Sequence, residues 1–407
     1  MHWFEQKRIY LDHASATPLA REVSSAPQEG EAFFANPGGI HADSVQARKK
    51  LESARGEIAR ELGCKPREVV CTSGLTESNN LAILGFARKL LLTGDSLAKT
   101  HWVVSAIEHD SVLECFGEVE RLGGKVSFVN PDERGIISPE YVERTLRPET
   151  VFVSIGWANN EIGVVQPLRA IAQVLQARSG AKPIVFHSDA GQGPLYLFPH
   201  VHTLGVDLFA LGGGKLYGPR TAGVLYVGKP DVLAPVLLGG SQEMGLRAGT
   251  EHLVPVVGFA RALEIISKER KEEGARLQEL RDMLARELSS RIPNLVVNGD
   301  LKHVLPHMLN VSIPDVSAEY VVLALDRDGI SISTKSACRE GESSSHVVAA
   351  LSDAASKAHA EESEWRARNT LRFSLGRGTT RNDIMRAAES LERIVQSYPH
   401  FAKSPDK

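Results

Sequence analysis

Short apolar runs rich in β-branched residues alternate along this chain of 407 residues with segments of helical periodicity. The clearest runs lie at residues 68–72, 102–105, 151–155, 184–187, 207–211 and 223–227. Apolar strands that are separated by helices are typical of a mostly parallel sheet covered by helices. The sequence therefore predicts an α/β fold in which these runs are the strands.

The most regular helical segment precedes the first of these runs. Apolar residues at positions 47, 51, 54, 58 and 62 recur every three or four residues, and Gly63 follows as a stop signal. After the strand at 68–72, Ser73 and Gly74 turn the chain into a second helix, for which Thr76 and Glu77 are favourable starting residues.

The pattern changes after about residue 260. A long charged helical stretch runs to about residue 290, and apolar runs follow at 309–313 and 370–374. The segment 356–367 is polar and predicts a solvated helix face or a loop. We expect a large domain of residues 15–260 and a smaller α+β domain made of residues 1–14 and 261–407.

Composition and charge narrow the class of protein. The formal net charge is −3 and no basic block is present, which argues against nucleic acid as a ligand. The cysteines Cys64, Cys71, Cys115 and Cys338 form no Cys-x-x-Cys pair, so reduced thiols and no metal site are expected. The N-terminal residues lack a signal peptide's apolar core, and no run is long enough to cross a bilayer, so a cytoplasmic protein without a membrane partner is expected.

Lys215 and Asp189 are the residues that point to a chemistry. Lys215 follows a run of three glycines, and a lysine held after such a turn can form a Schiff base with an aldehyde. Asp189 follows the strand at 184–187 and can keep a pyridine nitrogen protonated. Together they indicate pyridoxal phosphate as cofactor. The alternatives from the residues alone are a solvated surface lysine and an aspartate that caps a helix.

Several motifs, in a fixed order, carry a resemblance to a known family. They lie at residues 36–41, 72–80, 108–109, 159–163, 215–219, 247–250, 336–338 and 372–377. In these motifs the chain resembles the cysteine desulfurases of the NifS/IscS type, in the class V aminotransferase group of fold-type I pyridoxal-phosphate enzymes. The match extends from residue 9 to residue 377.

The resemblance implies a set of cofactor contacts. Lys215 would carry the cofactor and move protons, Asp189 would pair with the ring nitrogen, and His109 would stack on the ring and relay protons. The phosphate would lie at the start of the second helix. The remaining contacts implied for the cofactor come from Leu75, Thr76, Asn160, Gln192 and, from the neighbouring subunit of a homodimer, Thr250.

The segment before Lys215 departs from the family pattern. The usual Ser-Gly-His is replaced by Gly212, Gly213 and Gly214, which removes a hydroxyl and an imidazole. The amides of Gly212 and Gly214 are expected to replace some of the lost cofactor contacts, as backbone nests do around other anions. The alternative is a cofactor site that has decayed.

Cys338 and Arg372 determine the reaction that the resemblance implies. Cys338 would take the sulfur of L-cysteine as a persulfide and leave L-alanine, while Arg372 and Asn160 would bind the substrate. The segment from Cys338 to His346 is a residue shorter than in typical relatives and lacks their Leu-Glu-Pro element.

The sulfur would pass to an iron–sulfur scaffold or a tRNA-thiolation protein. Alternative functions are another class V activity, such as selenocysteine lyase or an aminotransferase, and a non-catalytic binding protein of a sulfur pathway.

Overall fold

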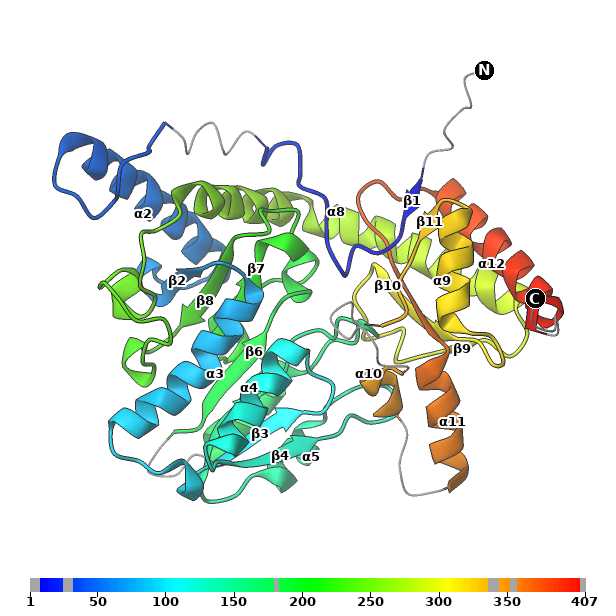
Figure 1. Ribbon diagram of the computed structural model, residues 1–407, viewed down its shortest axis with the longest axis horizontal. Helices are drawn as coiled ribbons and strands as arrows, with labels where there is room; N and C mark the ends of the chain where they lie inside the picture. Colours follow the sequence, from blue (N-terminus) through cyan, green and yellow to red (C-terminus); the bar gives the residue numbers. More distant parts are fainter. Residues whose placement is uncertain (1–7, 25–31, 179–182, 336–343, 352–356, 403–407) are drawn as a thin grey trace.

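A seven-stranded sheet forms the centre of the larger part of the molecule (Figure 1). The computed structural model describes residues 8–24, 32–178, 183–335, 344–351 and 357–402. Within these residues the strand order is β2-β8-β7-β6-β5-β3-β4, and only β8 runs antiparallel to its neighbours. The strands are β2 (Val69–Thr72), β3 (His101–Ser105), β4 (Lys125–Val129), β5 (Thr150–Ser154), β6 (Val185–Asp189), β7 (Leu208–Gly212) and β8 (Gly223–Val227).

The predicted strands are confirmed, with ends that differ by one or two residues. Strands β2, β3, β7 and β8 are buried along their whole length, which explains their continuous apolar sequence. Strand β4 was not predicted. It lies at the edge of the sheet, and only Val129 among its five residues is buried, so its sequence lacks the apolar run of the other strands.

Helices cover both faces of the sheet. They are α2 (Ala42–Leu62), α3 (Leu75–Leu92), α4 (Asp110–Arg121), α5 (Pro139–Thr145), α6 (Leu168–Arg178), α7 (Val201–Leu204) and α8 (Leu253–Arg291). Alternate residues of a strand face opposite sides. Phe209 and Leu211 of β7 therefore pack with α2, α6 and α8, whereas Leu208 and Ala210 pack with α3 and α4.

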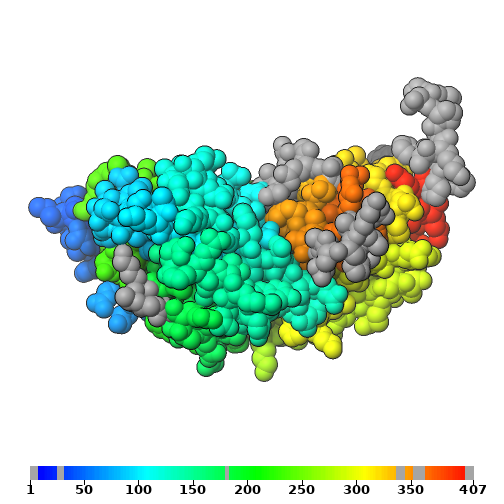
Figure 2. Space-filling view, turned by 90° about the horizontal axis from the view of Figure 1, so that it is seen from below, coloured from blue at the N-terminus to red at the C-terminus, as the bar shows by residue number. Residues whose placement is uncertain are grey.

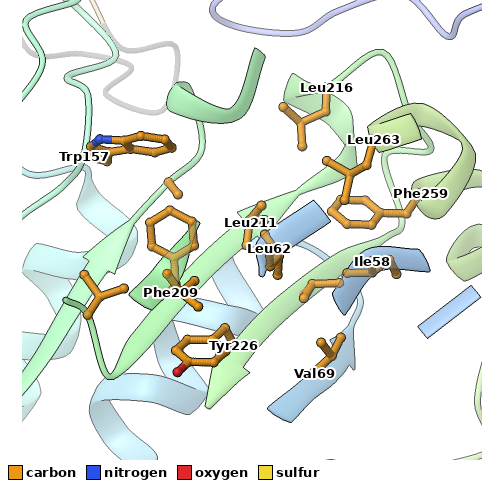
Figure 3. Packing of buried hydrophobic residues seen from close by; sticks show 14 of the residues in the cluster. Ile58, Leu62, Val69, Trp157, Phe209, Leu211, Leu216, Tyr226, Phe259 and Leu263 are labelled. Carbon is orange, nitrogen blue, oxygen red and sulfur yellow. The ribbon is translucent and has the colours of Figure 1, made fainter. Parts of the chain in front are cut away.

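The first of these two cores is shown in Figure 3. Ile58 and Leu62 of α2, Leu211 of β7, and Phe259 and Leu263 of α8 belong to the same cluster of buried side chains. The predicted stop of α2 is confirmed, because Gly63 caps the helix in the left-handed conformation, with φ of 66°.

A second core forms around two smaller sheets. The strands are β1 (Ile9–Tyr10), β9 (Val296–Val297), β10 (Met308–Ser312), β11 (Ile330–Ser331) and β12 (Thr370–Ser374), with β12-β10-β9 antiparallel and β1-β11 parallel. Helices α9 (Ala318–Arg327) and α12 (Arg381–Ala402) pack in this core. Helix α10 (His346–Ala349) and Ala367 of α11 (Lys357–Arg368) pack instead in a separate cluster with Ile107, Ile162 and Val164. Figure 2 shows the blue-to-green part of the chain toward one end of the long axis and the yellow-to-red part toward the other.

Helix α8 joins the two cores. Its residues up to Ile266 pack in the core of the large sheet, and Leu277, Leu284 and Leu288 pack in the second core. The predicted boundary at residue 260 falls inside this helix, and the division into two domains stays a prediction. None of the helices in the described residues is both long enough and apolar enough to span a membrane.

Short 3-10 helices complete the chain. They are η1 (Pro66–Glu68), η2 (Leu97–Lys99), η3 (Gly193–Leu195), η4 (Gly213–Lys215), η5 (Pro230–Val232) and η6 (Glu243–Gly245).

A buried ion pair fixes η6 against the large sheet. The Arg55 guanidinium of α2 donates from both terminal nitrogens to Glu243, at 2.7 and 2.8 Å, and the amide of Cys71 donates to the same carboxylate at 2.7 Å. The side chains of Arg55 and Glu243 are only 7% and 2% exposed. Glu243 and Met244 have φ of 46° and 58°, a conformation that costs free energy for residues other than glycine. The ion pair therefore stabilises a strained turn.

Replacing Glu243 with Ala should reduce the free energy of unfolding by about 3 kcal/mol, because the buried Arg55 charge then keeps only the half-exposed carboxylate of Glu52 as an ionic partner. Urea unfolding monitored by circular dichroism measures the loss. Glu118→Ala is the matched control, since it removes an exposed pair with Arg121 and should cost less than about 1 kcal/mol. Equal losses in the two variants would contradict this role for the buried pair.

Candidate active site

A cavity of about 220 Å³ lies at the carboxyl edge of the large sheet. The residues that line it follow the ends of neighbouring strands: Glu108 and His109 come after β3, Asn160 after β5, and Lys215 after β7. Asp189 is the last residue of β6. Parallel strands end at the same edge, which brings together side chains that are far apart in the sequence.

Lys215 ends η4 and lines the cavity. Its Nζ donates to the main-chain oxygen of Ala14, at 3.1 Å, and to that of Ser15. The turn before it depends on Gly213, because a Cβ at that position would lie 2.3 Å from the oxygen of Pro219. The alternative of a solvated surface lysine is therefore wrong.

The Asp189 carboxylate is held from two sides. Its Oδ2 accepts from Asn79 Nδ2 at 2.6 Å, and its Oδ1 accepts from the amide of Gly191 at 2.8 Å. The alternative of a helix cap is wrong, since the residue at the start of η3 is Gln192. Asn79 was given no role from the sequence, although it stands in the motif at 72–80. The Asn79–Asp189 contact joins residues 110 positions apart.

His109 is the N-terminal capping residue of α4 and lines the same cavity. Its Nδ1 accepts from the amide of Ser111 at 3.1 Å and contacts the Ser111 hydroxyl at 3.0 Å. Asn79 also donates to that hydroxyl, at 2.9 Å. A continuous chain of hydrogen bonds therefore joins His109, through Ser111 and Asn79, to Asp189.

Glu108 is a cavity residue whose side chain was given no role from the sequence. It is buried, and its Oε1 accepts from the amide of Gly156 at 2.6 Å. Burial raises the pKa of Glu108 to about 8, and the nearby charge of Asp189 acts in the same direction. The carboxyl group is therefore mostly protonated at neutral pH.

Gln192 and Asn160 belong to the same cavity as Lys215. Gln192 donates from Nε2 to the main-chain oxygen of Ala14 at 2.9 Å, which is also an acceptor for Lys215. The main-chain oxygen of Asn160 accepts from Arg372 at 2.9 Å. Both side chains line the cavity, as predicted for residues that contact a ligand.

Arg372 reaches the cavity from β12. Its side chain is 1% exposed and forms an ion pair with Asp12 at 2.8 Å, and the same nitrogen donates to the Ser15 hydroxyl at 2.6 Å. Its Nε is buried and has no hydrogen-bond partner among the described residues. The ion pair with Asp12 was not predicted, because it joins residues at opposite ends of the chain.

The first turn of α3 brings backbone amides to the cavity. Leu75 and Thr76 both line it, and the helix begins after Gly74 without a side-chain cap. The first N–H groups of a helix have no partner within the helix, and together with the helix dipole they favour an anion.

Gly212, Gly214 and Thr250 are predicted cofactor contacts that do not line this cavity. Gly212 lies behind Leu75, and the main-chain oxygen of Gly214 accepts from the amide of Thr17 at 3.0 Å. Thr250 is exposed and lines a separate hollow with Phe33 and Phe34. Their roles toward the cofactor stay predictions.

Cys338 lies outside the described residues. The other thiols are buried or half-buried, and burial raises the pKa of Cys64 and of Cys115 to about 12 each and raises the pKa of Cys71 as well. These three thiols are protonated at neutral pH, so none of them is a ready nucleophile.

Comparisons with known proteins agree along almost the whole chain. The family described as Aminotransferase class-V matches residues 9–386. The cysteine desulfurase IscS of Dictyoglomus turgidum is 36% identical over 393 residues, which cover 96% of this chain and 95% of that protein. The cysteine desulfurase IscS 1 of Archaeoglobus fulgidus is 35% identical over 390 residues, which cover 95% of this chain and 97% of that protein.

Solved structures show the same similarity. A NifS-like protein superposes with a TM-score of 0.85 at 28% identity, covering 96% of this chain and 99% of that one. The structure of SspA in complex with cysteine superposes with a TM-score of 0.75 at 34% identity, covering 90% of this chain and 98% of that one.

The buried Glu108 carboxyl makes stability depend on pH. Its pKa rises from an ordinary value of 4.5 to about 8 in the folded protein, which therefore binds this proton more tightly than the unfolded chain. The stabilisation is complete below pH 4.5 and is lost as the pH rises to about 8. Between pH 5 and 8 the protein prepared without cofactor should lose up to about 1.4 kcal/mol per pH unit relative to Glu108→Gln.

Urea unfolding of both proteins across this range measures the difference. Glu114→Gln is the control, because this residue of α4 is exposed, and it should follow the wild-type profile. Parallel profiles for the wild type and Glu108→Gln would show that Glu108 does not bind its proton more tightly in the folded state.

Proposed function

The chain belongs to the class V aminotransferase family, among the cysteine desulfurases of the IscS type, and on that premise we propose how its residues convert L-cysteine to L-alanine and transfer the sulfur to Cys338. The enzyme depends on pyridoxal phosphate, as its family does. The observation that carries the proposal is the single cavity that Lys215, Asp189, His109 and Arg372 share.

The residues of the cavity fit this cofactor. Lys215 supplies a primary amine for an aldehyde, Asp189 a carboxylate for a protonated ring nitrogen, and the start of α3 a set of amides for a phosphate. When bound, pyridoxal phosphate draws electrons away from the substrate α-carbon. Leu75 and Thr76 would hold the phosphate, His109 would face the ring, and Gln192 and Asn160 would contact its oxygen edge.

The hydrogen-bond chain from His109 to Asp189 would orient the Asp189 carboxylate toward the cofactor ring. Asn79 and the Gly191 amide fix the Asp189 carboxylate, so that it can hold a proton on the ring nitrogen. Lys215 moves the proton that the substrate α-carbon loses. The main-chain oxygens of Ala14 and Ser15, which accept from Nζ, hold the free amine at the cavity wall.

The described residues on both sides of the segment that carries Cys338 contact residues of the cavity. Ser333 pairs with Arg372 through main-chain hydrogen bonds of 2.6 and 3.2 Å, and its hydroxyl donates to the oxygen of Lys335 at 2.9 Å. Cys338 follows Lys335 by only three residues, which span at most about 11 Å. On the other side, Ser345 donates to Glu161 at 2.5 Å, and His346 contacts the main-chain oxygen of Glu108 at 3.1 Å.

The transfer of sulfur is balanced without a further oxidant. The Cys338 thiolate attacks the sulfur of the substrate, a sulfur–sulfur bond forms, and the carbon–sulfur bond of the substrate breaks. The electron pair stays with the carbon, which takes up a proton to become the methyl group of alanine. The enzyme keeps a persulfide on Cys338.

Assembly as a homodimer is part of the proposal. Phe34, Ile40 and Leu238 are 85%, 96% and 64% exposed, and contact with a second copy would remove these large apolar side chains from water. Thr250 is exposed beside a hollow of about 510 Å³ that Phe33 and Phe34 line. A second copy that covers these residues would place Thr250 near the phosphate of its neighbour.

We also propose a cytoplasmic location and transfer of the persulfide sulfur to an iron–sulfur scaffold or a tRNA-thiolation protein. This part of the proposal follows the IscS-type relatives.

Release of alanine from L-cysteine tests the reaction. With pyridoxal phosphate and a thiol reductant, the wild type should release alanine. Cys338→Ala should lose at least 100-fold of this activity, because none of the other three cysteines of the chain is a ready nucleophile. Cys64→Ala is the matched control and should keep the activity. A selenocysteine lyase or an aminotransferase would not require Cys338, and a folded wild type that releases no alanine would contradict the desulfurase.

Replacing Arg372 with Ala tests the binding of the substrate carboxylate. Loss of a charge-assisted pair of about 1.5–3 kcal/mol should raise the KM for cysteine about 10- to 100-fold, with little change in the absorbance of the bound cofactor. Arg393→Ala, which removes an exposed arginine paired with Asp328, is the control. An unchanged KM in Arg372→Ala would exclude this role.

A further inference from the structure

Leu75 lies between the ends of β6 and β7 and forms part of the cavity wall. It is the first residue of α3, so its own amide belongs to the group proposed to bind the phosphate. Its side chain packs toward the core of α3 and α4. The position of Leu75 therefore affects the cavity through both its backbone and its side chain.

Two glycines leave room for this leucine. A Cβ at Gly191 would lie 2.6 Å from Leu75 Cδ2, and a Cβ at Gly212 would lie 2.8 Å from Leu75 Cβ and 3.1 Å from Leu75 N. Gly212 has φ of −143°, and Gly191 is absent from the residues with positive φ, so neither backbone requires glycine. The space that Leu75 fills is what excludes a side chain at both positions.

The same contacts connect the two ends of the proposed cofactor site. The amide of Gly191 donates to Asp189 at 2.8 Å, and Gly212 faces the amide of Leu75. A side chain at either glycine would push Leu75 away, and with it the first turn of α3 or the turn that holds Asp189. Because Leu75 lines the cavity, such a displacement would change the space proposed for the cofactor.

We propose that Leu75 is a positioning residue for pyridoxal phosphate, and that Gly191 and Gly212 are the steric complement of its side chain. The wedge that these three residues form sets the spacing between the Asp189 carboxylate and the amides at the start of α3. This inference rests on the proposed function. A glycine at position 212 is then required by contact with Leu75, and its presence is no sign that the cofactor site has decayed.

A double-mutant cycle on cofactor affinity tests the wedge. The probe is pyridoxal phosphate, titrated into the full-length protein prepared without cofactor, with the absorbance of the bound form as readout. Gly191→Ala and Gly212→Ala should each raise the Kd at least tenfold. In a Leu75→Ala background Gly191→Ala should raise the Kd less than threefold, because Cδ2, the Leu75 atom closest to the new methyl group, is removed. Gly212→Ala should still raise the Kd at least tenfold in that background, because the Leu75 Cβ and amide that it meets remain.

Gly56→Ala is the matched control, since nothing lies within 4 Å of a Cβ at that helical position, and its Kd should stay at the wild-type value. If Gly191→Ala is unfolded by circular dichroism, folding of the Leu75→Ala/Gly191→Ala protein supports the same steric relation. Unfolding of that double variant as well would overturn it.

Two outcomes separate this inference from the proposed function. If the wild type binds pyridoxal phosphate and Gly191→Ala costs the same in both backgrounds, the wedge is wrong and the function stands. If the wild type does not bind pyridoxal phosphate, the proposed function fails and the role of Leu75 fails with it.

Discussion

The parallel arrangement of β7, β6, β5, β3 and β4 is the constraint on which the site depends. Because both faces of the sheet are covered by packed helices, polar groups find room only where the strands end. Asp189, Lys215 and Glu108 reach the cavity for this reason, each from the end of a different strand or the turn after it. The fold therefore determines where the chemistry occurs, and the residues after each strand determine what that chemistry is.

The second core contributes to the same cavity through one buried side chain. Arg372 extends from β12 to Asp12, Ser15 and the oxygen of Asn160, so its guanidinium joins the two ends of the chain and the turn after β5. Strand β10 pairs with β12 in the same antiparallel sheet. Helix α8 packs in both cores. The geometry of the substrate site consequently depends on the packing of both cores.

The sequence predicted the central sheet because buried strands have to be apolar along their length, whereas β4 could not be found because its exposed residues carry no such signal. The residues proposed to bear the chemistry were predicted from motifs, and the cavity includes Lys215, Asp189, His109 and Arg372. Their partners were not found. Asn79 beside Asp189 and Asp12 beside Arg372 are contacts between distant positions, which local spacing does not encode. The burial that changes the protonation of Glu108 likewise arises only once the chain is folded.

The turn at Glu243 has a consequence for assembly. Glu243 is tied to Arg55 and to the amide of Cys71, and Arg247, four residues later, donates to Glu77 of α3 at 2.8 Å. The exposed segment that carries Thr250 is thus attached within a single copy to β2, through Glu243, and to α3, through Arg247. In the proposed homodimer this segment would meet its partner with little conformational entropy left to lose, so more of the apolar contact would appear as affinity. A rigid surface of this kind also favours one geometry of pairing over others.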